Sequence, residues 1–523
     1  MLVTLGYVLS PFSLTSLSIS QVVLVISFFL LGVFIIKPAI SQWSRLRHVP
    51  GPFLNSITPL VYAWHTIRDG QAKYVYSLCQ KYGPVVRVTP NTVVVSDPQT
   101  LRYFCSLKAN YTKGLWAEFT RWDLKRYSCI AMRDNESRRE RKKKLLPAWS
   151  GQGLNVMEDR VDARIRDFLD LVERKYISTP AVFRPMEFGH RAQFFTLDVV
   201  TAVTFGKPWG FLEKDGDVNK YLEITEVMTP MFALLGALPW LVHSMHTWPL
   251  TKLMPGAGDQ VGFGCLIKLA SDEVQKRLQP DDKSSEFDLI NAYLKQGIDP
   301  EDVVQECITL AVAGSETTSA ALRVTLLALL TTPEAYRKLQ AEVDAFFANS
   351  SKSPNDVISY ADVKELKYLQ AVIRESLRVW PNASGISFTK QVPDTGDTIY
   401  GYRLPKGTEI SGCLMAMTRN KSLFGADADI FRPERWLEAD PTRAEEMWAT
   451  VELNFSAGKY VCLGKQLALM ELGKWFPEIL RRYEIAPTNN PVPMKLIDSV
   501  TWLPLNFWVR FTKRETTTEA VSG

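Results

Sequence analysis

The first 36 residues form one apolar segment. They carry no charged side chain, and residues 22–36 are apolar apart from one serine and one glycine. With its neighbours this run reaches roughly 20 residues, the length that a helix needs to cross a bilayer. Lys37, Arg45 and Arg47 follow, and positive charge on that flank places it in the cytosol. The pattern predicts a membrane anchor with one transmembrane helix in residues 1–37. A cleaved signal peptide is the less favoured alternative, because no basic segment precedes the apolar run.

Residues 38–52 are basic and rich in proline, and they separate the apolar run from the rest of the chain. Because Pro50-Gly51-Pro52 stops a helix, we interpret this segment as a hinge before one large domain at residues 53–523. Helical patterns dominate that domain, whereas alternating apolar residues predict a few strands. Helices are predicted at 300–331, from 333 onward and at 363–379, and strand pairs at 84–98 and 500–511. The expected fold class is mainly α with a small β-rich subdomain.

Residues 228–253 are markedly apolar but contain several prolines and glycines. These residues interrupt any helix that could span a membrane. We expect helices and a loop that cover an apolar cavity and touch the membrane surface. A buried helix pair is the alternative.

The composition excludes several functional classes. A net charge of +5 on 523 residues is too small for a typical nucleic-acid binder, so no nucleic-acid partner is expected. The seven cysteines are scattered and odd in number, which fits neither a disulfide framework nor a zinc site. They fit a reducing compartment.

Cys462 stands between the loop that begins at Gly458 and a helical pattern that continues beyond Gly464. A cysteine at a helix N-terminus faces unpaired N–H groups and the positive end of the helix dipole. Both stabilise a thiolate, which is a metal ligand or a nucleophile. An inert buried cysteine is the alternative for Cys462 taken alone.

Two further segments carry candidate chemistry. The stretch AGSETT places Glu316 and Thr317 in the middle of the long predicted helix, where an acid and an alcohol beside a glycine form a plausible proton relay. In ESLR, Glu375 and Arg378 share a helix face and can form an ion pair, and Arg435 of FRPERW is a possible third member.

In this order, the motifs AGxET, ExxR, PERW and FxxGxxxC resemble those of the cytochrome P450 family, the haem-thiolate monooxygenases. The chain is most similar to membrane-anchored members from filamentous fungi that modify secondary metabolites. The resemblance runs from the proline hinge to the C-terminus. It implies a haem b cofactor with Cys462 as the axial iron ligand, enclosed by the loop Gly458–Gly464 and by Phe455. It also implies that Glu316 and Thr317 deliver protons to bound oxygen, and that Glu375, Arg378 and Arg435 are structural.

The chain departs from the family pattern at the positions that bind the haem propionates. Tyr460 stands where the family has Arg or His, and Lys459 beside it is a possible substitute. Lys390 replaces an arginine in the segment after ExxR. Arg138 stands in place of an aromatic residue or histidine. The resemblance therefore leaves Lys390 and either Arg141 or Lys142 as propionate partners.

The expected enzyme inserts one atom of O2 into a small apolar substrate, a terpenoid or polyketide intermediate. It takes electrons from NADPH through cytochrome P450 reductase, partly through a contact with basic residues in 138–144. The expected location is the endoplasmic reticulum membrane, with a single span and a cytosolic catalytic domain. A haem-thiolate isomerase or dehydratase that does not use O2 is one alternative. A non-catalytic membrane-anchored binding protein is another.

Overall fold

The computed structural model describes most of residues 37–514. The gaps are 69, 124, most of 239–261, 280–286, 351–352, 354, 383–385, 387, 489–491 and 499–500. The predicted transmembrane helix lies outside this part of the chain, as does most of the second half of 228–253. Among the described residues, no helix is both long and apolar enough to cross a bilayer.

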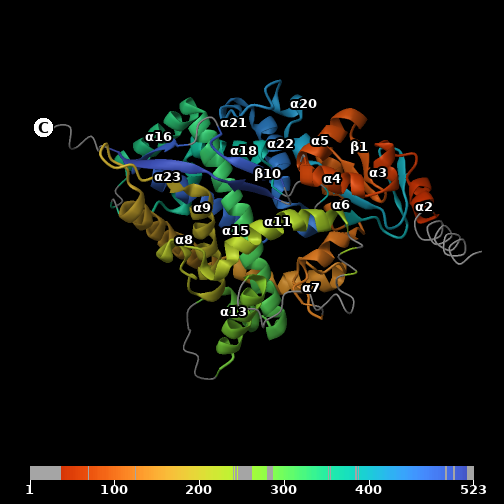
Figure 1. The fold of residues 1–523 in the computed structure, drawn as a ribbon, viewed down its shortest axis with the longest axis horizontal. Helices are drawn as coiled ribbons and strands as arrows, with labels where there is room; N and C mark the ends of the chain where they lie inside the picture. The colour runs from red at the N-terminus through yellow and green to blue at the C-terminus, as the bar shows by residue number, and fades with distance from the viewer. Residues whose placement is uncertain are drawn as a thin grey trace, which may run out of the picture.

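Helices make up most of the molecule (Figure 1). In chain order they are α2 (Lys37–Arg45), α3 (Phe53–Ile57), α4 (Leu60–Arg68), α5 (Gln71–Tyr82), α6 (Pro98–Cys105), α7 (Asn135–Leu145), α8 (Gln152–Leu171), α9 (Phe188–Phe205), α10 (Phe211–Lys214), α11 (Tyr221–Ala237), α13 (Gly262–Arg277), α14 (Leu289–Lys295), α15 (Pro300–Thr331), α16 (Pro333–Ala348), α17 (Tyr360–Glu365), α18 (Lys367–Val379), α19 (Leu414–Thr418), α20 (Lys421–Phe424), α21 (Arg435–Glu438), α22 (Pro441–Val451) and α23 (Lys465–Leu480).

In the described part of the chain, the strands are short and form four small sheets. Their bounds are β1 (Val85–Thr89), β2 (Thr92–Val95), β3 (Thr112–Lys113), β4 (Met186–Glu187), β5 (Lys390–Gln391), β6 (Asp397–Ile399), β7 (Tyr402–Leu404), β8 (Glu409–Gly412), β9 (Tyr483–Pro487), β10 (Lys495–Asp498), β11 (Trp502–Leu505) and β12 (Trp508–Lys513). The largest sheet has the order β1-β2-β8-β5-β3. Only its β2–β8 pair is parallel, with Val93 opposite Ile410.

The expectation of a mainly helical fold with small sheets is confirmed. The strand pair at 84–98 is formed by β1 and β2, which are antiparallel. The pair predicted at 500–511 is wrong, because β11 pairs with β10, whereas β12 pairs with β4 and β9. The helix predicted at 363–379 is broken at Leu366, so that α17 and α18 are separate.

The long helix α15 positions the rest of the domain. It begins where the sequence predicts, with the Asp299 side chain accepting a hydrogen bond from the N–H of Glu301 and Pro300 at the first helical position. Shown in green in Figure 1, it runs through the molecule and packs on α9 and α13. Most of its second half is buried in the main core, which also includes side chains of α8, α9 and α23.

The segment predicted as a hinge is docked on the domain. Leu46 and Val49 are buried, and the Arg87 guanidinium donates to the main-chain oxygens of Gln42 and Trp43. A Cβ at Gly51 would lie 2.3 Å from the main-chain oxygen of Arg87, so only glycine fits there. The residues nearest the expected anchor are therefore held against β1.

Candidate active site

A loop before α23 presents Cys462 to a cavity. The N–H of Cys462 donates to the oxygen of Phe455 over 2.9 Å, which closes the loop. Gly458 has φ of +52°, and a Cβ there would lie 2.3 Å from the oxygen of Cys105. Glycine is thus required at this position for two reasons, its backbone conformation and its close packing against Cys105.

The thiol of Cys462 is surrounded by donors. Burial raises its pKa, but hydrogen bonds from the N–H groups of Gly464 and Lys465 lower it, as does the positive charge of Lys142. The side chain lines the cavity and is exposed to it. Donors aimed at the sulfur would stabilise a thiolate ligand, as the sequence predicts.

The cavity extends from Cys462 to α15 and encloses about 360 Å³. On the α15 side it is lined by Ala313, Gly314 and Thr317. A Cβ on Gly314 would lie 2.9 Å from Cγ2 of Val200, so α9 and α15 are in close contact here. The hydroxyl of Thr317 donates to the oxygen of Ala313 over 2.9 Å. Its lone pairs remain able to accept from a group in the cavity.

Glu316 does not line this cavity. It is buried toward α9, where the amide nitrogen of Gln193 donates to its carboxylate. Burial raises the pKa of Glu316, and the nearby Arg323 opposes that shift. The structure therefore brings Thr317, but not Glu316, to the cavity, and the proton-transfer role of Glu316 stays a prediction.

Five cationic side chains line one end of the cavity: Lys113, Arg138, Lys142, Lys390 and Lys459. Three of them surround the ring of Tyr460, with the charged groups of Arg138, Lys390 and Lys459 at 4.5, 4.6 and 5.4 Å from its centroid. Burial lowers the pKa of Lys113 to about 7 and that of Lys459 to about 8. Lys113, Arg138 and Lys390 are buried, and buried cations in one place favour anionic partners.

This end of the cavity fits the two propionate groups of a haem. Among the described residues, the lysine ammonium groups of this cluster donate only to main-chain oxygens, as in the bonds from Lys113 to Cys129 and Ile130 and from Lys142 to Val461. Nε of Arg138 is buried and has no hydrogen-bond partner among the described residues. A dianionic group would offset the charge of this cluster and pair with that nitrogen.

The structure separates the two alternatives for a propionate partner in α7. Lys142 lines the cavity. Arg141 is not among the lining residues and forms ion pairs with Asp302 at 2.5 Å and Glu306 at 3.1 Å. Arg138, one turn before Lys142, and Lys113 are the cations that the sequence argument did not assign to the propionates. Lys113 belongs to no sequence motif. Its position at the cavity is recognisable only from the structure, where β3 pairs with β5 and Lys113 lies opposite Lys390.

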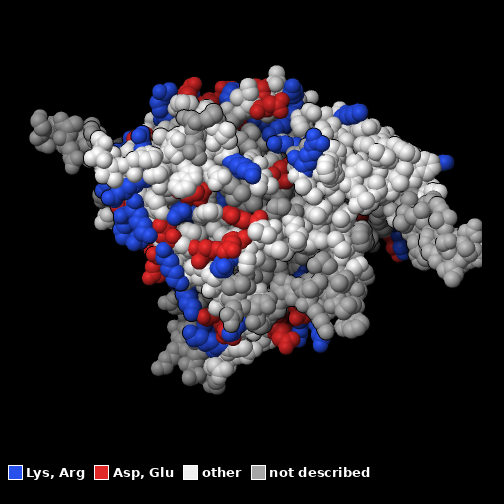
Figure 2. All heavy atoms as spheres, in the orientation of Figure 1, with Lys and Arg blue, Asp and Glu red and all other residues white. Residues whose placement is uncertain are grey.

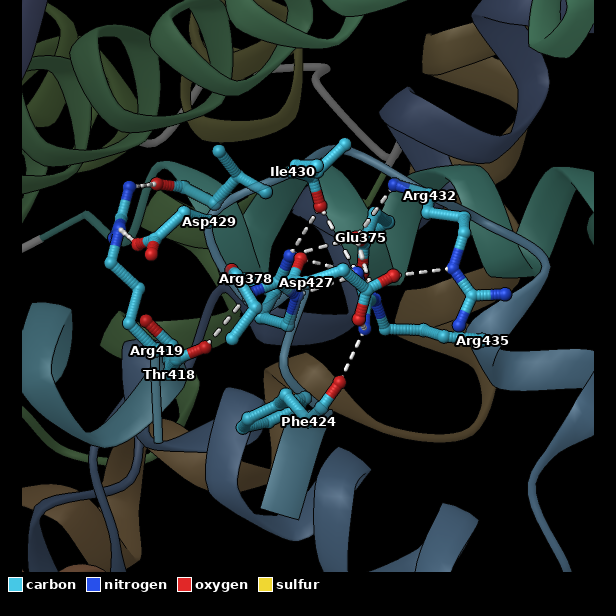
Figure 3. Close-up of polar contacts among 12 residues, drawn as sticks. Glu375, Arg378, Thr418, Arg419, Phe424, Asp427, Asp429, Ile430, Arg432 and Arg435 are labelled. Atoms are coloured by element: carbon cyan, nitrogen blue, oxygen red, sulfur yellow. Dashed lines mark hydrogen bonds and ion pairs between the residues drawn. The ribbon is translucent and has the colours of Figure 1, made fainter. Parts of the chain in front are cut away.

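Behind the cavity, Glu375, Arg378 and Arg435 form a buried ionic network (Figure 3). The Glu375 carboxylate accepts from Arg378 at 2.8 Å, from Arg435 at 2.9 Å and from the indole of Trp436 at 2.9 Å. Arg378 and Arg435 also donate to main-chain oxygens, among them that of Ile430. None of the three charged residues lines the cavity, which agrees with a structural role.

A large helical domain, a cysteine enclosed by backbone donors and a cationic end for a dianion together define a haem-thiolate type of protein. The sequence matches the family described as Cytochrome P450 over residues 50–511. The chain belongs to the cytochrome P450 family, and its enzyme class is monooxygenase.

Known relatives cover nearly the whole chain. Cytochrome P450 monooxygenase ABA1 of Pyricularia oryzae is 32% identical over 490 residues, which are 92% of this chain and 95% of that protein. Cytochrome P450 monooxygenase aba1 of Botryotinia fuckeliana is 32% identical over 476 residues, 90% of this chain and 93% of that protein. Cytochrome P450 monooxygenase cicH of Emericella nidulans is 29% identical over 488 residues, which are 91% of this chain and 95% of that protein.

Proposed function

We propose that this protein is a haem-thiolate monooxygenase that inserts one oxygen atom from O2 into a small apolar intermediate of secondary metabolism, a terpenoid or a polyketide. The observation that carries the proposal is the placement of Cys462, with its donors from Gly464 and Lys465, across a largely apolar cavity from Thr317. The chain's similarity to three fungal monooxygenases supports the reaction class.

Haem would be held by Cys462 through iron and by the cationic cluster, including Arg138, Lys142 and Lys390, through its propionates. When bound, a haem with a thiolate ligand activates O2. The apolar lining excludes water and binds the substrate by burial of its surface. The Thr317 hydroxyl donates to the main-chain oxygen of Ala313, and its lone pairs can accept from a proton donor in the cavity and so position that donor for proton transfer. Burial raises the pKa of Glu316, which favours its protonated form on the α9 side of the same helix.

Electrons would come from NADPH through cytochrome P450 reductase. Arg139, Lys143 and Lys144 on α7 are exposed, and they offer positive charge to an acidic partner. We also propose that residues 1–37 anchor the protein in the endoplasmic reticulum membrane with the domain in the cytosol. The exposed apolar side chains of α3, α4 and α11 support contact with that membrane.

The decisive experiment replaces the proposed ligand. The Cys462→Ala variant should lose the red-shifted absorption band of the ferrous–CO complex and with it NADPH-dependent oxygenation. Cys265→Ala is the matched control, because Cys265 is a partly exposed cysteine of α13 away from the cavity. A Cys462→Ala protein that kept the band would refute the assignment. Product formation without NADPH or O2 would instead indicate an isomerase or dehydratase.

A further inference from the structure

Asn382 is a cavity residue that the reaction class does not explain. It lies directly after Pro381, whose main-chain oxygen accepts from the indole of Trp502 over 2.9 Å. This contact fixes the loop after α18 against β11. The amide nitrogen of Asn382 donates to the main-chain oxygen of Thr317 over 3.2 Å, and the side chain lines the cavity. Asn382 is therefore held beside the residue that faces Cys462 across the cavity.

The contact with Thr317 determines which way the amide points. A main-chain carbonyl can only accept a hydrogen bond, so Nδ2 of Asn382 must face it. Oδ1 is left as an acceptor, and no described residue donates to it. Asn454, the other amide among the lining residues, differs, because its Nδ2 donates to Leu377 and Val451 and its Oδ1 is buried.

The neighbouring groups offer acceptors rather than donors. The hydroxyl hydrogen of Thr317 is already donated to Ala313, so its lone pairs are what remain for a ligand. Oδ1 of Asn382 and Oγ1 of Thr317 thus belong to one acceptor site in a largely apolar cavity. Of the two carboxyl groups that line the cavity, Glu306 is already paired with Arg141, and Glu471 lies on α23, which begins beside Cys462 and not beside Asn382. A cationic amine therefore finds no free carboxylate among the described residues at this acceptor site. A neutral hydroxyl matches this site best.

We propose that Asn382 binds a hydroxyl group of the substrate, so that the protein acts on an apolar skeleton that already carries one alcohol. This inference rests on the proposed function and specifies its substrate class. It also implies a place in a reaction sequence. A reaction that installs a hydroxyl, such as an earlier oxygenation, the reduction of a ketone or the addition of water to a carbocation or an alkene, must precede this one.

A hydrocarbon of the same shape would leave the oxygen of Asn382 desolvated and without a partner. The cost of such a buried acceptor corresponds to roughly 10- to 100-fold in affinity. The full-length haem-loaded protein should therefore bind an alcohol about 10-fold or more tightly than its matched hydrocarbon. In Asn382→Leu the two affinities should become equal within about 3-fold, because the unpaired acceptor is gone.

The test is isothermal titration calorimetry with pairs of an alcohol and a hydrocarbon that share one skeleton, such as cedrol and cedrane. Monoterpene pairs and aromatic polyketide pairs of the same kind are titrated as well. Thr501→Val is the matched control, since it removes another hydroxyl of the cavity lining, and it should keep the preference. The ferrous–CO band of each variant verifies that it is folded and loaded.

Three results would overturn the inference: equal binding of every pair by the wild type, a preference that survives in Asn382→Leu, or no binding by any pair. An Asn382→Leu variant that released more peroxide while keeping the preference would indicate that Asn382 positions water instead. If the wild type shows no red-shifted ferrous–CO band, the proposed function itself is refuted. Failure of the proposed function can therefore be distinguished from failure of the inference about Asn382.

Discussion

Glu316 and Thr317 are adjacent in sequence but face different neighbours. Successive residues of a helix are rotated by about 100°, so adjacent side chains point in different directions. Thr317 lines the cavity, whereas Glu316 contacts Gln193 of α9. The motif could be recognised from the sequence, but the division of its residues between a cavity and a helix interface depends on how α9 packs.

We expect Thr317→Ala to retain haem and substrate binding but to transfer less oxygen to the substrate. Without the hydroxyl, proton delivery in the cavity is impaired, and a fall in coupling of roughly 10-fold or more is expected. The measurement compares NADPH consumed, product formed and peroxide released. Thr325→Ala is the control, because Thr325 makes the same type of bond to its own helix, to Ala321, outside the cavity. Similar coupling in both variants would exclude a special role for Thr317.

Glu375→Gln should be among the most destabilising changes in the chain. Its carboxylate is fully buried between Arg378 and Arg435 (Figure 3). Neutralising it removes the anion that both buried cations share and, among the described carboxylates, leaves Arg435 with the partly exposed Asp427 alone. Breaking such a network costs about 3–5 kcal/mol in the free energy of unfolding. Thermal or urea unfolding would measure the loss.

Glu438→Gln is the matched control for Glu375→Gln. Glu438 pairs with Arg432, but its side chain is 60% exposed. An exposed pair contributes at most about 1 kcal/mol, so little change is expected. Equal effects of the two variants would show that burial of the ion pair does not decide its contribution.

The residues that sequence reasoning missed have one property in common. Lys113 and Asn382 belong to no motif, and each is brought to the cavity by a segment distant in sequence, Lys113 by β5 and Asn382 by α15. Local patterns predict which residue types suit a task. They do not predict pairings between residues that lie 65 or more positions apart in the sequence.

Helix ends were the most predictable elements because their signals are local. The start of α15 follows from Asp299 and Pro300, which act on the first turn itself. The strands at the C-terminus were not predictable in this way. β11 and β12 have the right pattern, but their partners β10, β9 and β4 include a strand more than 300 residues away.

The contact between α9 and α11 should depend on pH. His190 of α9 lies 2.7 Å from Glu226 of α11 and 3.2 Å from Glu187. The hydrogen bond to Glu226 raises the pKa of His190, against the effects of burial and of Arg323. A raised pKa means that the folded state holds this proton more tightly. The stabilisation is therefore complete below the unfolded pKa of about 6.5 and is lost as the pH rises through the folded value.

We expect His190→Gln to lower the melting temperature by about 1 °C at pH 5.5, because the pair is partly exposed, and to have almost no effect at pH 9. Differential scanning calorimetry at both pH values would measure the change in melting temperature. His48→Gln is the control, since the His48 ring contacts the main-chain oxygen of Arg403. A His190 effect that was equal at both pH values would mean that the charge of the ring does not stabilise this contact.

At the scale of the whole molecule, charge is unevenly distributed. In Figure 2 the face over α3 and α4 carries few charged side chains, in contrast with the opposite side of the view. Exposed apolar residues gather on α3, α4 and the neighbouring α11: Phe53, Leu54, Leu60, Trp64, Ile67, Val227 and Met231. This apolar face follows closely after the predicted anchor, so both can reach the same membrane.

Deletion of residues 1–37 should therefore release the protein from membranes only in part. Adding Trp64→Gln and Ile67→Gln to the deletion should release most of the remainder, because the apolar face supplies the residual binding. Sedimentation with liposomes measures the bound fraction. Leu437→Gln on α21 is the control, since Leu437 is 50% exposed but lies outside this face. Complete release by the deletion alone would contradict the proposed role of the face.

The pairing of β3 with β5 places Lys113 directly opposite Lys390 at the edge of the largest sheet. Like charges in that arrangement oppose strand pairing, and a bound dianion relieves the repulsion. The lifetime of the chain in a cell should therefore depend on haem supply, because an unloaded chain has a weakened sheet edge that proteases can attack. In a haem-starved host, Lys113→Met should outlive the wild type, as a pulse-chase experiment would measure. Equal lifetimes would show that this edge does not limit survival.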